Sequence, residues 1–357
     1  MMAAGGSGSP ATVVLDSQDW IIDRAVLLPS NLELVIDGCR LKLADGVHDN
    51  IIRSAGIKPD PANPNGVCLA VEPVENIRIT GCGNAVIEGA DKPYTAVNPK
   101  TGAVEEWLGD FFGWRTVGIQ LSKVSRYEIS GFTMRKTHCW AISQEQCIYG
   151  YLHDIVFDTD VKNGDGIDFR NGCSFCFVEN ISGKVSDDMV ACTALNGTYI
   201  TPGSKYIYPM QPLGCDFEDD VADIHDIVIR NINYATQPVL RPQVHWPAPQ
   251  ACGHGVICLA KSPKVYNITI ENIVEEKCSG ENVDDGCVKI YTGYGSGYRK
   301  GNLRNISVRN VVTRGSSCAI KVKADVMNVM IDGVKQLMPG GVTHRFEGDS
   351  ENLRIEC

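Results

Sequence analysis

Three short segments carry the residues of this chain that are best suited to chemistry. They are NGDGID at 163–168, SDD at 186–188 and GHG at 253–255. Clustered carboxyl groups cannot all stay ionised cheaply, so at least one should hold a proton near neutral pH. Glycoside hydrolysis requires such a pair: one carboxyl protonates the leaving oxygen, and another activates water or attacks the sugar.

Each segment alone has a simpler explanation. N-G-D-G is a common turn sequence, and an isolated histidine such as His254 is more often structural. The 163–168 segment is also similar to one copy of a calcium-binding nonapeptide, but a calcium roll needs several copies in succession. The prediction of a catalytic group therefore depends on the joint spacing of the three segments. We expect neither a metal nor another cofactor.

A recurring phrase must position these residues. It consists of Asn or Asp followed by alternating apolar residues, as in YNITIENI from Tyr266 and RNISVRNV from Arg304. Asn305, Asn328 and Asn352 are 23 and 24 residues apart, and the step from Asp154 to Val178 is again 24. This spacing matches one coil of a β-solenoid, with one strand per phrase.

The alternation within each phrase is typical of a half-buried strand. Repeats of this length cannot bury their apolar face alone, so they must stack on their neighbours. The sequence thus predicts an all-β fold, a single parallel β-helix over 11–357, with 1–10 as a flexible leader or an expression scar. The competing architecture, an antiparallel sandwich, would show hairpin turns every ~8–12 residues.

The one-coil spacing also brings the acids together. Asp165 and Asp187 are 22 residues apart, and stacked strands lie ~4.8 Å apart. We therefore expect Asp165, Asp187 and Asp188 to converge. Three longer insertions, at 91–116, 195–220 and 235–251, should loop out on the surface and build a binding face.

Charge and composition exclude several classes of partner. The net charge of −10 argues against wide contact with nucleic acid or an anionic membrane. The start of the chain lacks the basic and apolar regions of a signal peptide, which leaves the compartment open. The 15 cysteines should mostly be small core residues. The clearest examples lie inside apolar stretches or in the C-x-x-C pair: Cys82, Cys173, Cys176, Cys192, Cys258, Cys287 and Cys318.

At the three acidic and histidine segments the sequence resembles glycoside hydrolase family 28, the polygalacturonases and their relatives. The family's N-T-D-G-hydrophobic-D motif is similar to 163–168, its G-D-D to 186–188 with Ser186 in place of Gly, and its G-H-G to 253–255. Flanking stretches also resemble the family, so the resemblance spans nearly the whole chain. It implies a right-handed parallel β-helix with inserted loops.

The resemblance further implies an inverting mechanism. Asp187 would be the general acid, with His254 supporting it, while Asp165 and Asp188 would position and deprotonate the water. Inversion would place the acid and base carboxyl groups ~6.5–9.5 Å apart. Asn163 and Asp168 are expected among the substrate-binding residues.

One departure from the family concerns the substrate. The R-x-K-T motif, which binds the galacturonate carboxylate, is replaced by Lys289-Ile-Tyr291-Thr. Lys289 can still act as a point charge, and Tyr291 can stack on a sugar or hydrogen-bond it. We expect a carbohydrate partner of pectin type, rhamnogalacturonan-like, decorated or neutral, attacked at chain ends. The alternatives are a β-helix polysaccharide lyase and a non-catalytic carbohydrate-binding β-helix.

Overall fold

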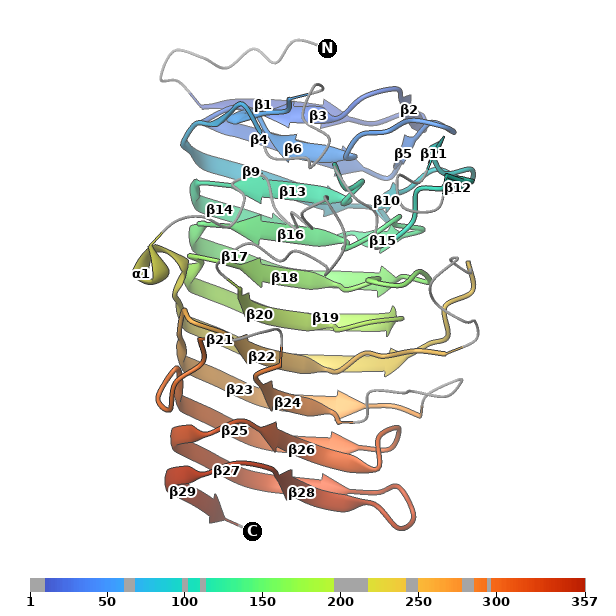
Figure 1. Ribbon diagram of the computed structural model, residues 1–357. Coiled ribbons are helices and arrows are strands. Elements are labelled where there is room, and N and C mark those ends of the chain that lie inside the picture. The colour runs from blue at the N-terminus through green and yellow to red at the C-terminus, as the bar shows by residue number, and fades with distance from the viewer. Residues whose placement is uncertain are drawn as a thin grey trace.

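The chain forms a right-handed parallel β-helix, as the sequence predicts. Figure 1 shows the coils of the computed structural model stacked along one axis, from the blue N-terminal strands to the red C-terminal ones. The leader, apart from Pro10, lies outside the described residues. The structure describes residues 10–60, 68–97, 102–109, 114–195, 218–241, 250–277, 286–293 and 297–356.

Two long parallel sheets run the length of the helix. The path of the larger one is β1 (Ala11–Leu15), β4 (Leu32–Asp37), β9 (Val74–Cys82), β14 (Val124–Ser130), β17 (Ile148–Asp158), β19 (Ser174–Val185), β21 (Ile224–Thr236), β23 (Val265–Glu275), β25 (Leu303–Thr313), β27 (Val326–Gln336) and β29 (Ser350–Glu356). Four shorter strands extend it: β2 (Trp20–Ile22), β5 (Arg40–Leu43), β10 (Val86–Glu88) and β15 (Thr133–Arg135).

The smaller sheet carries the candidate site. It consists of β3 (Val26–Leu28), β6 (Ile52–Ser54), β13 (Ile119–Ser122), β16 (Ile142–Glu145), β18 (Ile167–Arg170), β20 (Val190–Ala194), β22 (Val256–Ala260), β24 (Val288–Tyr291), β26 (Cys318–Lys323) and β28 (Val342–Phe346). Each coil through the site therefore has two strands. Each Asn-containing phrase forms one strand of the larger sheet, as predicted, and the short second strand of each coil, which lacks the phrase, is an addition that the phrases did not predict.

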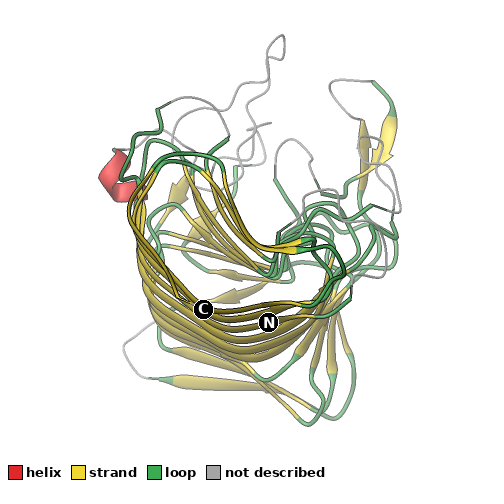
Figure 2. Ribbon diagram, turned by 90° about the horizontal axis from the view of Figure 1, so that it is seen from below, coloured by secondary structure: helices red, strands yellow, loops and turns green. Residues whose placement is uncertain are grey.

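The remaining elements are small. They are helix α1 (Asp219–Ala222) and two antiparallel pairs, β7 (Ile57–Lys58) with β8 (Ala70–Val71) and β11 (Thr95–Val97) with β12 (Val104–Glu106). Figure 2 shows the β11–β12 hairpin, part of the predicted 91–116 insertion, projecting away from the coils. Of the predicted 195–220 insertion, 196–217 lies outside the described residues. No helix in the described ranges is long and apolar enough to span a membrane.

The core is a set of apolar rows, each formed by one residue per coil. In the smaller sheet, Ile142, Ile167, Val190 and Val256 pair in register and all have 0% exposure. Each such side chain contributes ~1.5–3 kcal/mol through burial. Stacking coil on coil thus gives the repeat its stability.

Most cysteines are core residues, as predicted. The described cysteines are all free thiols, and most of them are buried, including Cys173 and Cys176. Cys82 is an exception, because it is exposed and its Sγ lies 3.2 Å from Asp37 Oδ1. The alternation at the end of β9 points Cys82 outward, so its predicted core position is wrong.

The asparagine of the repeated phrase is a bend inside a long strand. Asn267, Asn305, Asn328 and Asn352 have φ between 52° and 56°, a left-handed conformation that Asn tolerates better than most residues. Their side-chain amides form a ladder, each Nδ2 donating to a side-chain Oδ1 of the preceding coil at 2.9–3.1 Å. The 23- and 24-residue steps of the sequence are confirmed here.

The step predicted from Asp154 is wrong by two residues. Asn180 Nδ2 donates to Asp154 Oδ1 at 3.1 Å, a separation of 26 residues, and Val178 pairs with Leu152. In the phrase that starts at His153 the bend residue, Asp154, is the second residue, whereas in the phrase that starts at Phe177 the bend residue, Asn180, is the fourth. Matching the two phrases by their first residues therefore gave a step that is two residues too short. The side-chain ladder sets the true register.

A second amide ladder on β23 offers a test of what holds the coils. Asn272 has φ 57° and bonds Asn231 at 2.9 Å and Asn310 at 3.1 Å. We expect Asn272→Ala to lower the free energy of unfolding by ~2–4 kcal/mol, through left-handed strain and two lost hydrogen bonds. Asn272→Gly keeps the conformation and should cost less. Urea unfolding in which the Ala variant equals the Gly variant would contradict this account.

Candidate active site

Asp165, Asp188 and His254 occupy equivalent positions on three consecutive coils. Each precedes a strand of the smaller sheet, β18, β20 and β22. Gly166 N donates to Asp188 O at 2.9 Å, and Met189 N donates to His254 O at 2.7 Å. The three side chains therefore start from one row along the helix axis.

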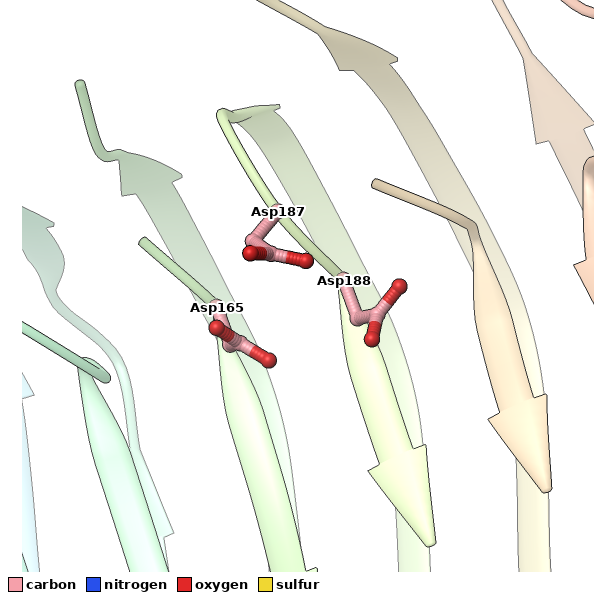
Figure 3. A group of neighbouring side chains, drawn as sticks. All are labelled: Asp165, Asp187 and Asp188. Carbon is pink, nitrogen blue, oxygen red and sulfur yellow. The ribbon is translucent and has the colours of Figure 1, made fainter. Parts of the chain in front are cut away.

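Asp187 lies one residue before that row. The sequence pairs Asp165 with Asp187 as coil neighbours, but the backbone register places Asp188 beside Asp165. Figure 3 shows the three carboxylates gathered at the ends of the chain segments that lead into β18 and β20. The error is one residue because the true step between these two coils is 23 residues, as in the pairing of Ile167 with Val190, and not the 22 that separate Asp165 from Asp187.

The three carboxylates converge as expected. Asp165, Asp187 and Asp188 each place an oxygen within 4.8 Å of the others, and they are only 5%, 7% and 8% exposed. A water that hydrogen-bonds each oxygen at ~2.7 Å can bridge this span. The ~6.5–9.5 Å separation that the resemblance implies refers to the acid and base carboxyl groups as a whole, so this distance between closest oxygens is a different quantity.

Asp187 is held by three donors at a single oxygen. Its Oδ2 lies 2.6 Å from Lys162 Nζ, 3.0 Å from Cys252 Sγ and 3.3 Å from the backbone N of Asn163. Lys162 Nζ also lies 3.1 Å from Cys252 Sγ. Sequence reasoning missed Lys162 and Cys252, and its only available signal was that each directly precedes a predicted motif.

His254 hydrogen-bonds Asp188, the neighbour of the aspartate that the resemblance has it support. Asp188 Oδ1 lies 2.9 Å from His254 N and 2.5 Å from His254 Nδ1. The imidazole is only 1% exposed. Burial raises the pKa of Asp188, while the charge and hydrogen bond of His254 oppose that rise. The register that aligns His254 with Asp188 decides this partnership.

Asp165 is the most strongly perturbed carboxyl that faces the cluster. Burial raises its pKa well above the usual range, and the charges of Asp168, Asp187 and Asp188 raise it further, while Lys162 opposes them. Its Oδ1 has no hydrogen-bond partner among the described residues. These conditions favour the protonated form.

Asp168 lies on β18 and is completely buried. Burial raises its pKa well above the usual range, opposed chiefly by Arg170, whose Nη1 lies 3.9 Å from Asp168 Oδ1. The guanidinium groups of Arg170 and Arg115 both lie over the ring of Trp140, at 4.5 and 4.9 Å from its centroid. Asp168 thus belongs to a buried layer of charged and aromatic groups beside the acids.

Lys289 and Tyr291 face the same side of the smaller sheet, on β24. Lys289 Nζ lies 4.5 Å from the centroid of the Tyr291 ring, and the Lys289 charge lowers the pKa of Asp188. In the sheet register Lys289 pairs with Lys321, which pairs with Arg345. Three cations therefore follow one another on adjacent coils.

Gly253 allows the close approach of two coils at the site. A Cβ at this position would lie 1.8 Å from the backbone O of Asp187, so any larger residue would displace one of the two segments. Ser186, which stands where the motif that the sequence resembles has Gly, donates from its Oγ to Val161 O at 2.5 Å.

Three carboxylates at this spacing could in principle hold a divalent cation. Here the ammonium of Lys162 already provides the positive charge at Asp187, and a second cation beside it would be repelled.

Comparison with solved structures shows the fold. The polygalacturonase of Erwinia carotovora subsp. carotovora is similar with a TM-score of 0.52 and 13% identity, over 93% of this chain and 81% of that one. The tailspike protein of Escherichia coli bacteriophage HK620, in complex with a pentasaccharide, is similar with a TM-score of 0.53 and 11% identity, over 98% of this chain and 60% of that one. No family model and no curated protein matches the chain.

The buried acids make stability depend on pH. Because the folded state raises the pKa of Asp168 above its unfolded value of ~3.9, the free energy of unfolding should fall as pH rises from about 4 toward the folded pKa. We expect Asp168→Asn to weaken that fall, and the exposed control Asp349→Asn to leave it unchanged. Denaturant unfolding from pH 4 to 9 measures this, and parallel curves for Asp168→Asn and the wild type would contradict it.

Proposed function

We propose that this protein is a glycoside hydrolase of the family 28 type that cleaves a polysaccharide or oligosaccharide with its three aspartates. The observation that carries the proposal is the set of three buried carboxylates with oxygens within 4.8 Å of one another. Binding a sugar does not require such a costly arrangement of like charges. The motif resemblance and the fold shared with a polygalacturonase support it.

The chemistry needs one proton donor and one proton acceptor. A protonated carboxyl gives its proton to the glycosidic oxygen as the bond to the anomeric carbon breaks, and an ionised carboxyl removes a proton from the attacking water. Oxygens of three carboxylates surround a position of about the size of one water, which favours direct attack by water. The first product is therefore expected with an inverted anomeric centre.

A row of cations supports an acidic substrate. Lys289, Lys321 and Arg345 pair directly on β24, β26 and β28, although like charges opposite each other destabilise a sheet. An anionic ligand along this row would offset that cost, on a chain whose net charge is −10. We therefore propose a pectin-type polymer with carboxylate groups, lying along the helix axis toward the C-terminal coils.

The described part of the 235–251 insertion supports attack at chain ends. Leu240 N bonds Asp160 O at 2.9 Å, and Arg241 Nη2 bonds Thr137 O at 2.6 Å. This segment therefore folds against coils on the N-terminal side of the acids. At that position the segment would limit how far a substrate extends toward the N-terminal coils. The cation row lies on the C-terminal side of the acids.

A screen of purified protein against pectic and neutral oligosaccharides tests the function. We expect new reducing ends with an acidic substrate, and a loss of kcat of at least ~10²-fold in Asp188→Asn, because a positioned proton-transfer group contributes ~10²–10⁴-fold. The exposed variant Asp349→Asn serves as the control.

Two results of that screen would contradict the proposal. Full activity in Asp188→Asn would remove the acids from the mechanism. A product with the ultraviolet absorption of an unsaturated uronate would identify a lyase instead.

The substrate class has its own test. We expect Lys321→Gln to lower kcat/KM on an acidic pectic oligosaccharide about 3- to 10-fold and to weaken its salt dependence, because one screened charge contact is lost. Lys335→Gln, an exposed lysine on β27 of the other sheet, is the matched control. An equal loss in both variants would rule out the cation row as a binding surface.

A further inference from the structure

We propose that the outer face of the larger sheet carries a second carbohydrate site, centred on Tyr149, which takes neutral sugar residues. The site lies on β14, β17 and β19, whereas the three acids precede strands of the smaller sheet. It is therefore separate from the candidate active site and does not depend on the proposed hydrolysis. Three features carry the inference: a break in the asparagine ladder, two exposed aromatic rings and a groove beside them.

The ladder through the bends of the larger sheet is interrupted over three consecutive coils. In the register of β9, β14, β17, β19 and β21, the bend residues are Asn76, Arg126, Tyr149, Phe175 and Asp226, all with φ between 54° and 58°. Asn76 donates to Asn31 at 2.9 Å, and Asp226 accepts from Asn267 at 3.1 Å. The three residues between these two pairs lack the side-chain amide that the ladder uses.

An aromatic residue is a costly choice for such a bend. The left-handed conformation is disfavoured for bulky side chains, and Asn tolerates it better. Tyr149 and Phe175 are also 55% and 48% exposed, so burial of their rings offsets little of that cost. Backbone outliers of this kind cluster at functional sites. The two rings are therefore a reason to assign a ligand to this face.

Tyr149 and Phe175 form one continuous aromatic platform. Their ring centroids are 5.3 Å apart and their planes are inclined by 20°. The edge of His225 supports the other side of Phe175, with centroids 5.3 Å apart and planes at 88°. These contacts hold the rings in place and leave about half of each side chain accessible. The C–H face of a pyranose is apolar and can stack on such a ring.

A groove of about 350 Å³ adjoins Tyr149 on the side of the N-terminal coils. Tyr149 and Tyr151 line its aromatic end, and Arg78, Arg126 and Glu128 supply charged groups along it. Arg78 Nε lies 3.1 Å from a Glu128 oxygen. Sugar hydroxyls both donate and accept, so a guanidinium and a carboxylate side by side can bind two hydroxyls of one ring. An apolar surface with a few convergent polar groups is the usual lining of a ligand site.

The charges of the groove favour a neutral sugar. Arg78 lies 3.8 Å from Glu33 and 3.1 Å from Glu128, and Arg126 forms an ion pair with Glu75. In the described part of the groove, two guanidinium groups thus face three carboxylates. No positive excess remains to attract an acidic sugar. The site therefore differs in its ligand from the cation row on the smaller sheet.

Asparagine is the substitution that tests this site without loss of the fold. Tyr149→Asn and Phe175→Asn each place at the bend the residue type that the ladder uses elsewhere. We expect the free energy of unfolding to stay unchanged or to rise in both variants, as measured with urea. Leu337→Asn, at a position that is 52% exposed, is the matched control for the loss of an exposed apolar side chain.

Binding is measured by native electrophoresis through gels that contain a soluble polysaccharide. The neutral probes are arabinan, galactan and dextran, and polygalacturonate is the acidic comparison. Every protein also carries Asp188→Asn, so that turnover does not consume the probe. We expect at least one neutral probe to retard the protein. Tyr149→Asn and Phe175→Asn should each weaken the apparent Kd about 3- to 10-fold, and Leu337→Asn should leave it unchanged.

Three results would overturn the proposal. The first is no retardation by any neutral probe, and the second is equal retardation of the Tyr149→Asn and Leu337→Asn proteins. The third is a dimer in sedimentation velocity that Tyr149→Asn abolishes, which would assign the rings to a second copy of the chain. The assay measures binding and needs no cleavage, so a failure of the proposed hydrolysis would leave its result unchanged.

Discussion

The fixed register between parallel coils is the constraint on which the rest of this structure depends. Each coil hydrogen-bonds to the next through both long sheets, so one residue per coil falls into a row along the axis. Apolar rows make the core, and the asparagine ladder lies at exposed positions. A shift of one residue would turn each row to the opposite face. The site is one such row, formed by the residues that precede β18, β20 and β22.

Stacking of this kind brings like groups together, with effects that depend on their chemistry. Asparagines gain from it, because a side-chain amide both donates and accepts, and the ladder through Asn305 and Asn328 runs from coil to coil. Acids and lysines lose from it, because equal charges repel at this distance. Where the chain nevertheless stacks acids, at Asp165 and Asp188, or lysines, at Lys289 and Lys321, a ligand or a reaction is the natural explanation.

The acid cluster is made tolerable by unequal compensation. Lys162 forms an ion pair with Asp187 and His254 hydrogen-bonds Asp188, whereas Asp165 Oδ1 has no hydrogen-bond partner among the described residues. Burial raises the pKa of Asp165 well above its usual range and also raises the pKa of Asp188. The proposed hydrolysis, which needs one proton donor and one acceptor, would depend on this asymmetry, because three identical carboxyl environments would titrate together.

The sequence by itself determined the parallel β-helix, because alternation within each phrase and a step of one coil are local patterns of apolar and polar residues. It also identified Asp165, Asp187, Asp188 and His254 as one group, since residues a coil apart become neighbours. Only the tertiary structure decided which member contacts which. Coil lengths vary with each turn, so a difference of one residue moved His254 to Asp188, and the contacts of Lys162 and Cys252 arise between coils that no local pattern connects.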